Sequence, residues 1–249
     1  MSSSPLNRAR VESSIAIARK VFGHFNVALP PIANWSVEDW HRAGAEYDEV
    51  RDCMLGWDVT DFGSNDFTHI GRVLFTLRNG NLHDSRYPKG YAEKLILDPE
   101  GQRAPAHFHL TKREDIINRA GGNILVQLTC VGEDNAPAKG TLAVQVDGCR
   151  RLISSGETVR LRPGESLCIP PRTIHQFWGE EGTGLVIDGI GYTVSSEVSS
   201  VCDDLQDNYF LAAMTRFPAI VEDAPRKHYL CNEYPAASTP DSSRARSCS

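Results

Sequence analysis

The sequence has no long apolar run and no extended basic run. No window of its 249 residues approaches the ~18 apolar residues that a membrane-spanning helix needs. Lys and Arg never cluster over more than a few positions, and the net charge is −6. Binding to a nucleic-acid backbone depends on clustered positive charge. These absences argue against a membrane protein and against a nucleic-acid binder, and they leave a small-molecule partner as the better expectation.

A disulfide or zinc-ribbon cysteine pattern is also missing. The cysteines are odd in number and stand singly, without the short spacings that such frameworks show; they are Cys53, Cys130, Cys149, Cys168, Cys202, Cys231 and Cys248. The first twenty residues lack the continuous apolar segment of a secretion signal. We therefore expect reduced thiols and a cytoplasmic protein.

Two kinds of local pattern divide the chain. Apolar residues at helical spacing between residues 6 and 24 predict a first helix, and Ser36 with Asp39 resembles a capping box that opens a second one over about residues 36–50. From residue 56 onward short β-rich runs alternate with turn dipeptides, which is typical of a sandwich or small barrel. Asp147-Gly148 is the strongest hairpin signal, because both residues tolerate positive φ angles.

These patterns predict one all-β-dominated fold with N-terminal helices. We expect a helical arm over residues 1–55, packed on a β-barrel formed by residues 56–235. Residues 236–249 have almost nothing to bury, so a disordered tail is predicted there.

Two motifs suggest a metal site. In an extended strand alternate side chains share a face, so His107 and His109 can converge on one ion. Glu114 would lie on the opposite face of a regular strand, and a bend near residues 112–113 must bring it back. His175 arrives from a separate segment behind two prolines. A His-x-His pair on its own occurs by chance about as often as it marks a metal site. Imidazoles together with one carboxylate favour a divalent ion, and Mn²⁺, Co²⁺, Zn²⁺ and Fe²⁺ are all compatible with this ligand set.

The spacing of these residues resembles the cupin motifs. His-x-His is followed after four residues by Glu114 and after six more by Gly121, and Gly164, Pro170 and His175 match most of the second motif. Longer stretches, among them "CMLGWDVTDFG", "YAEKLI" and "KREDIINR", are similar to the D-lyxose isomerase family over about residues 25–235. One departure is Leu110, which stands where that family has Trp.

The resemblance implies a cupin β-barrel of jelly-roll type, a homodimer, and an aldose–ketose isomerase with a divalent metal ion, for which we favour Mn²⁺. Its expected reaction interconverts D-lyxose and D-xylulose, and also D-mannose and D-fructose. Two alternatives stay open at this point: an iron-dependent cupin dioxygenase, and a non-catalytic cupin that binds a sugar through its metal. Oxygen dependence and metal preference separate the first of these from an isomerase.

Isomerisation moves a proton from C2 to C1, so the protein must supply a base and an acid. The resemblance puts Lys94 in the pocket, where its ammonium can hold or protonate a sugar oxygen. Glu197 is a candidate base if burial raises its pKa, although a carboxylate at a strand end fits the sequence equally well. Asp204 is a candidate for substrate contact within an acidic segment that also reads as a solvated loop. Neither the physiological metal nor the choice between proton transfer and hydride shift follows from the sequence.

Overall fold

The computed structural model describes residues 4–237. Helices occupy the N-terminal part: α1 Arg8–His24, α2 Val37–Arg42 and α3 Asp48–Asp52, with 3₁₀ turns at Pro31–Asn34 and Ala45–Tyr47. Strands follow: β1 Gly56–Thr60, β2 Arg72–Arg78, β3 Tyr91–Pro99, β4 His107–Phe108, β5 Glu114–Ala120, β6 Ile124–Val131, β7 Pro137–Ala138, β8 Thr141–Val146, β9 Cys149–Ser154, β10 Thr158–Leu161, β11 Ser166–Ile169, β12 Thr173–Gly179, β13 Leu185–Ile187, β14 Ile190–Ser200 and β15 Tyr209–Phe210. Within the described residues no helix has the length and apolar character to cross a membrane. Most of the predicted disordered tail, residues 238–249, lies outside the described part of the chain.

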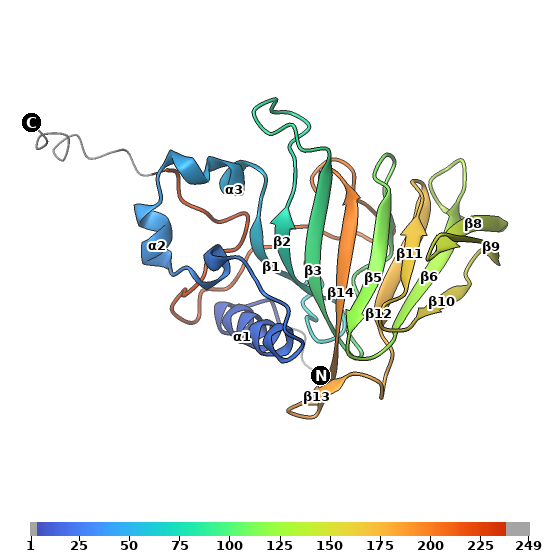
Figure 1. The fold of residues 1–249 in the computed structure, drawn as a ribbon, viewed down its shortest axis with the longest axis horizontal. Coiled ribbons are helices and arrows are strands. Elements are labelled where there is room, and N and C mark those ends of the chain that lie inside the picture. Colours follow the sequence, from blue (N-terminus) through green and yellow to red (C-terminus); the bar gives the residue numbers. More distant parts are fainter. Residues whose placement is uncertain (1–3, 238–249) are drawn as a thin grey trace, which may run out of the picture.

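The strands form two antiparallel sheets (Figure 1). The larger has the order β1-β2-β3-β14-β5-β11-β8-β9, with β13 added beside β14, and the smaller has the order β10-β6-β12-β4-β15, with β7 beside β6. The helices gather at the β1 end of the large sheet. This arrangement confirms the predicted all-β barrel of cupin type with N-terminal helices. The division of the chain at residues 55 and 235 remains a prediction.

The large sheet is apolar on both faces, and alternation along its strands separates two cores. Val73 and Phe75 of β2 pack with α1, whereas Leu74 between them belongs to the core enclosed by the two sheets. In β3, Leu95 and Leu97 likewise face the α1 side. The residues with the opposite parity therefore point into the barrel, and this parity decides which polar side chains can reach its interior.

The helical region matches the prediction in its first helix and differs in the second. The Asn7 side chain caps α1 by accepting a hydrogen bond from the backbone N–H of Arg10 at 2.9 Å, and Ser36 and Asp39 form the predicted capping box. The single helix predicted over residues 36–50 is wrong, because the backbone is extended at Ala43 and Gly44. The Arg51 guanidinium donates to the carbonyl oxygens of both residues at 2.9 Å, which stabilises the break.

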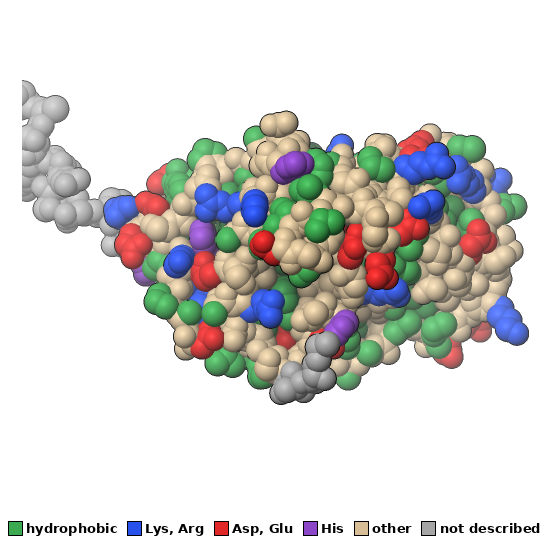
Figure 2. Space-filling model, turned by 90° about the horizontal axis from the view of Figure 1, so that it is seen from below, with side chains coloured by type: hydrophobic (Ala, Val, Ile, Leu, Met, Phe, Trp, Pro, Cys, Tyr) green, Lys and Arg blue, Asp and Glu red, His purple; other side chains and the backbone are tan. Residues whose placement is uncertain are grey.

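Two further predictions concern turns and surface charge. Asp147 and Gly148 join β8 to β9 with φ angles of 49° and 78°, so the predicted two-residue hairpin is confirmed. On the face shown in Figure 2, acidic and basic side chains lie interspersed and no basic surface runs across it. This distribution agrees with a net charge of −6 and gives a polyanion no continuous surface on that face.

Candidate metal centre and active site

One pocket between the two sheets contains every residue that the sequence singled out for chemistry. Its lining includes Lys94, His107, His109, Glu114, His175, Glu197 and Asp204. These residues come from both sheets and from the loop after β14, so the barrel brings together groups that lie more than a hundred positions apart in the sequence. The pocket also contains polar residues that the sequence analysis did not select, Lys112, Asn208 and Arg216.

Three histidines converge at one end of the pocket. His107 on β4 lies directly opposite His175 on β12 in an antiparallel pair, so both project from the same face of the small sheet. Their ring centroids are 4.3 Å apart, and the centroid of His109 lies 5.1 Å from that of His107. Each ring offers one nitrogen such that all three nitrogens lie within 4.8 Å of one another. The three side chains could therefore hold a metal ion.

Backbone carbonyl groups fix the tautomer of each ring. The Nδ1 atom of His107 lies 2.9 Å from the carbonyl oxygen of Pro105, and that of His175 lies 3.0 Å from the carbonyl oxygen of Thr173. The Nδ1 atom of His109 contacts the carbonyl oxygen of Asp207 in the same way. A carbonyl oxygen only accepts, so each Nδ1 donates and each neutral ring keeps its lone pair on Nε2, which is the arrangement that a metal-binding imidazole needs.

Glu114 reaches the histidines from the other sheet. It is the first residue of β5, and the bend predicted before it carries the chain from the small sheet to the large one. The Asp207 carboxylate fixes this bend by accepting the backbone N–H groups of Leu110, Thr111 and Lys112 at 2.6, 3.1 and 2.9 Å. Asp207 therefore stabilises the bend that brings Glu114 to the histidines.

The position of Glu114 fits a cation between the two sheets. Its Oε1 atom lies 2.7 Å from Nε2 of His175, and its Oε2 atom lies 3.8 Å from Nε2 of His109. Nε2 of His175 and Oε1 of Glu114 thus face each other across the space between the two sheets. Nε2 of His109 and Oε1 of Glu114 are buried atoms without a hydrogen-bond partner. A divalent cation bound by these atoms would supply the contacts that they lack.

Electrostatics keep this set ready to bind a cation. Burial lowers the pKa of His107 well below its usual 6.5, and burial, followed by the nearby Lys112 ammonium, lowers that of His109 to about 4. Burial by itself would raise the pKa of Glu114, but Lys112 and His175 outweigh it, so the net pKa is well below 4.5. At neutral pH the site therefore contains an ionised Glu114 carboxylate, and His107 and His109 need lose no proton before they bind a metal.

A second cluster of charges lies beside the histidines on the large sheet. Lys94 of β3 and Glu197 of β14 are directly opposite each other in neighbouring strands, with Nζ 3.6 Å from Oε1. Burial would raise the pKa of Glu197, but Lys112 and then Lys94 lower it below its usual 4.5. Burial thus acts on Glu197 in the direction that its candidacy as a base required, but the two lysines outweigh burial and the net pKa is lowered. The carboxylate is ionised and ready to accept a proton, although it is a weaker base than expected.

Lys112 joins the two clusters and was not recognised from the sequence. Its ammonium lies 2.7 Å from Oε2 of Glu114 and 2.8 Å from Oε1 of Glu197. The side chain is 4% exposed, which is rare for a lysine that has no ion-pair partner. Its position in the sequence, between the predicted ligands His109 and Glu114, could have indicated that Lys112 lies in the pocket. A residue in the segment that crosses from one sheet to the other can point into the space that the sheets enclose.

The far side of the pocket is formed by the segment after β14. Asp204 accepts hydrogen bonds from the Arg216 guanidinium at 3.0 and 3.2 Å, and its Oδ1 lies 3.7 Å from Nζ of Lys94. Phe177 is buried and lines the pocket. Trp178 has the opposite parity on β12 and stacks under Arg103 instead, with the guanidinium 3.7 Å from the ring centroid.

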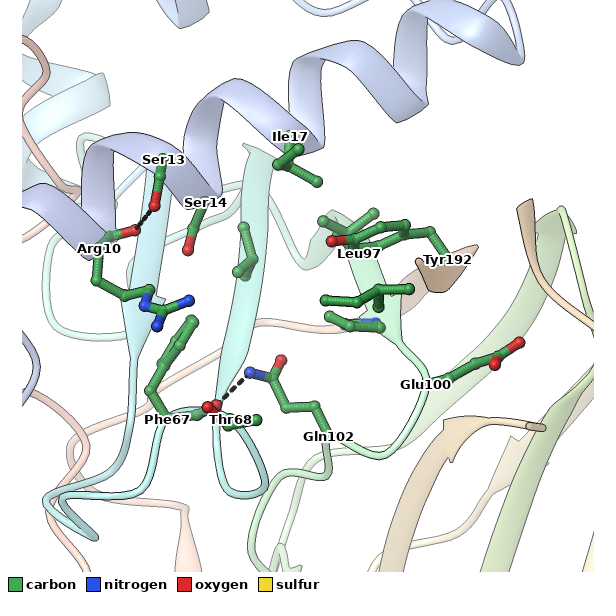
Figure 3. A pocket seen from close by; sticks show the side chains of 13 residues that line it. Arg10, Ser13, Ser14, Ile17, Phe67, Thr68, Leu97, Glu100, Gln102 and Tyr192 are labelled. Atoms are coloured by element: carbon green, nitrogen blue, oxygen red, sulfur yellow. Dashed lines mark hydrogen bonds between the residues drawn. The ribbon is translucent and has the colours of Figure 1, made fainter. Parts of the chain in front are cut away.

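Another pocket lies on the outer face of the large sheet (Figure 3). Ile17 of α1 covers Leu97 and Tyr192 there, and Arg10 and Gln102 stand at its sides. Its lining contains none of the histidines, lysines or carboxylates described above. The chemistry therefore belongs to the pocket inside the barrel, and the outer pocket lies beneath the helix that packs against the sheet.

Known proteins similar in sequence to this chain are sugar isomerases. The chain is 44% identical over 230 residues to the D-lyxose/D-mannose isomerase of Escherichia coli O157:H7, covering 92% of this chain and 98% of the relative. It is 47% identical over 214 residues to the enzyme of the same name from Serratia proteamaculans, covering 86% of this chain and 91% of the relative.

Solved structures show the same fold at low sequence identity. The L-ribose isomerase of Cellulomonas parahominis matches with a TM-score of 0.56 at 16% identity, over 89% of this chain and 99% of that chain. The L-ribose isomerase of Acinetobacter sp. DL28 matches with a TM-score of 0.57 at 15% identity, over 89% of this chain and 100% of that one. The family model described as D-lyxose isomerase matches residues 6–234. The chain thus belongs to the D-lyxose isomerase family and is an aldose–ketose isomerase.

Proposed function

We propose that the enzyme interconverts D-lyxose with D-xylulose and D-mannose with D-fructose, and that it uses a divalent metal ion, most favourably Mn²⁺. The observation that carries this proposal is that one pocket contains both a three-histidine, one-carboxylate set and a buried carboxylate between two ammonium groups. Family membership favours an isomerase over the dioxygenase and the non-catalytic sugar binder, and the curated relatives are named for these two sugars.

The metal would be held by Nε2 of His107, His109 and His175 and by the Glu114 carboxylate. When bound, a divalent ion polarises the sugar carbonyl and stabilises negative charge on the oxygens at C1 and C2. Nitrogen and oxygen ligands without sulfur suit Mn²⁺, with Co²⁺, Zn²⁺ and Fe²⁺ as alternatives. The bend held by Asp207 would keep Glu114 opposite the histidines during turnover.

The protein side chains supply the proton chemistry. Glu197 would take the proton from C2 of the open-chain aldose and return it to C1, because it is ionised and faces the pocket. The Lys94 ammonium would hold or protonate a sugar oxygen while the carbonyl and hydroxyl exchange places. Lys112, which lies against Glu197 and Glu114, would keep both carboxylates ionised and correctly placed.

Unpartnered polar atoms support a polyhydroxylated substrate. Oδ1 of Asn208 and Nη1 of Arg216 are buried without a hydrogen-bond partner, and both residues line the pocket. A buried polar atom without a partner is costly, and sugar hydroxyl groups can both donate and accept. We assign these two atoms and the Asp204 carboxylate to the hydroxyl groups at the end of the sugar away from C1.

The experiment is a metal add-back assay. Protein stripped with a chelator is tested on aldopentoses and aldohexoses, with each divalent ion returned separately and oxygen removed. We expect activity on D-lyxose and D-mannose to return with Mn²⁺ in the absence of oxygen. Oxygen consumption that accompanies turnover would favour the dioxygenase, and tight metal binding without any sugar interconversion would favour the non-catalytic binder. Solvent deuterium at C1 of the product would identify proton transfer instead of a hydride shift.

We further propose that the enzyme works as a homodimer in the cytoplasm. The dimer rests on the family resemblance, and sedimentation or light scattering of the purified protein tests it. The compartment is supported by the cysteines, because all six that the structure describes are free and free thiols are typical of a reducing environment.

A further inference from the structure

The thiol of Cys202 lies closer to the Lys94 ammonium than either neighbouring carboxylate. Nζ of Lys94 is 2.8 Å from Sγ of Cys202, compared with 3.6 Å from Glu197 and 3.7 Å from Asp204. Cys202 stands two positions after the end of β14, in the segment that forms the far side of the pocket. A side chain without formal charge therefore occupies the position nearest to the ammonium that we propose holds the sugar.

The same thiol also contacts Asp204. Its Sγ atom lies 2.9 Å from Oδ1 of Asp204, and because a carboxylate only accepts, the thiol donates this hydrogen bond. Burial raises the pKa of the Cys202 thiol to about 12, so it keeps the hydrogen that it donates. The sulfur thus contacts both the ammonium and the carboxylate.

The backbone of Cys202 is fixed by one side chain from another loop. Asn79, just after β2, accepts from the Cys202 N–H at 3.0 Å and donates to the Cys202 carbonyl oxygen at 2.9 Å. Asn79 is itself buried. These two hydrogen bonds define where the cysteine stands, so the sulfur position does not depend on the rest of the loop.

We infer that Cys202 is a positioning residue for Lys94: its sulfur accepts a hydrogen bond from the ammonium, which therefore points to the sulfur instead of forming a direct ion pair with Asp204, and N–H groups stay available to the sugar. Sulfur is a weak hydrogen-bond acceptor, so a sugar oxygen can compete for the ammonium. A carboxylate in direct contact, at about 2.7–2.9 Å, forms a charge-assisted hydrogen bond that is roughly twice as strong as a neutral one. This inference rests on the proposed role of Lys94.

The test compares three replacements in the metal-loaded enzyme. Cys202→Ala and Cys202→Val remove the sulfur contacts, and Val also fills the space in case the smaller side chain destabilises the fold. For both we expect the KM for D-lyxose to rise about tenfold, with kcat within about threefold of wild type, because the ammonium then pairs with Asp204 and the sugar must displace it. Cys202→Ser keeps a donor and an acceptor and should restore KM to within about threefold of wild type.

Cys53→Ala is the matched control. Its backbone carbonyl oxygen also contacts the Asn79 side chain, at 3.4 Å, and the residue is buried. Unlike that of Cys202, its sulfur makes no hydrogen bond to Lys94 or Asp204. We expect this variant to keep the wild-type KM. If Cys202 had only a structural role, Cys202→Ala and Cys53→Ala would lower the melting temperature while leaving KM unchanged, and that result would overturn the inference.

Lys94→Met separates this inference from the proposal on which it rests. Full activity in Lys94→Met would remove Lys94 from the reaction, and the role of Cys202 with it. Loss of turnover in Lys94→Met together with a wild-type KM in both Cys202→Ala and Cys202→Val would overturn the positioning role alone. If both hold, adding Cys202→Ala to Lys94→Met should change the remaining KM by less than about twofold, because the group that the sulfur positions is already gone.

Discussion

Replacing Lys112 by Met should destabilise the protein strongly, and more at neutral than at acidic pH. The substitution keeps most of the side-chain volume and removes the ammonium. It leaves Glu114 and Glu197 buried without the cation that lies 2.7 and 2.8 Å from their oxygens. The side chains of the two carboxylates are 3% and 9% exposed, so water cannot replace the lost contacts.

Removing one partner of a buried ion pair costs about 3–5 kcal/mol, because an uncompensated charge stays behind. Solvent screening does not reduce this figure here, since the Lys112 side chain is only 4% exposed. Lys94 remains near Glu197 at 3.6 Å and offsets part of the loss there. We therefore expect a destabilisation near the lower end of the range, about 3 kcal/mol, measured by urea unfolding in the presence of a chelator so that metal binding does not contribute.

The pH dependence has a definite sign. Lys112 lowers the pKa of both Glu114 and Glu197, so their ionised forms stabilise the wild-type protein above the unfolded-state pKa of about 4.3. In Lys112→Met both pKa values rise, and the folded variant takes up protons at a higher pH than the wild type does. The difference in the free energy of unfolding should therefore shrink as the pH falls from 7.5 to 5.

Arg113→Met is the control, because it removes a cation from the next position. Arg113 is exposed, and its guanidinium contacts the Cys168 sulfur at 3.6 Å. A change within about 0.5 kcal/mol is expected there, as for most surface substitutions. Equal effects of the two substitutions, or a destabilisation by Lys112→Met that does not change with pH, would refute the reasoning.

Three further predictions concern metal, turnover and substrate. His175→Ala should lower metal content, measured by plasma emission spectrometry, together with activity, whereas the exposed His24→Ala should change neither; full activity without metal would contradict the site. Lys94→Ala and Glu197→Gln should lose about 10²- to 10⁴-fold in kcat while keeping metal, and a loss below threefold would remove that residue from the mechanism. D-mannose should be about 10- to 200-fold poorer than D-lyxose in kcat/KM, because one extra carbon changes binding by ~1–3 kcal/mol. D-xylose and D-glucose, inverted at C2, should react far more slowly, and a preference for either over D-lyxose would show that the substrate assignment is wrong.

Alternation explains why much of the metal set could be predicted from the sequence. His107 and His109 share a face because they are two positions apart, and the need for a bend before Glu114 followed from its odd spacing. Both are local geometric facts. Only the topology shows that the bend crosses from one sheet to the other, with Asp207 holding it from nearly a hundred positions away.

Other parts of the site depend on long-range contacts that a sequence does not contain. The burial of Lys112 results from two sheets closing around it, and the sequence indicated only a charged residue near a strand end. Three pocket-side residues, Cys202, Asn208 and Arg216, come from an irregular segment. Its sequence has no helical or strand periodicity from which the direction of a side chain could be predicted. The role of Glu197 as a base was made conditional on burial raising its pKa, and the net pKa is lowered because two lysines from other segments lie beside it.

The hydrogen bonds that orient the three imidazoles have a consequence for divergence among related enzymes. Their acceptors are main-chain oxygens of Pro105, Thr173 and Asp207. A point mutation changes a side chain and leaves the backbone carbonyl group in place. As long as the backbone keeps its course, amino-acid substitutions at these three positions therefore do not remove the hydrogen bonds that orient the imidazole rings. The ammonium, thiol and carboxylate groups beside them have no such protection, because every one of their contacts can be altered by a single codon. Single substitutions can thus change the contacts of the groups proposed to transfer protons more readily than they can change the orientation of the histidines that would bind the metal.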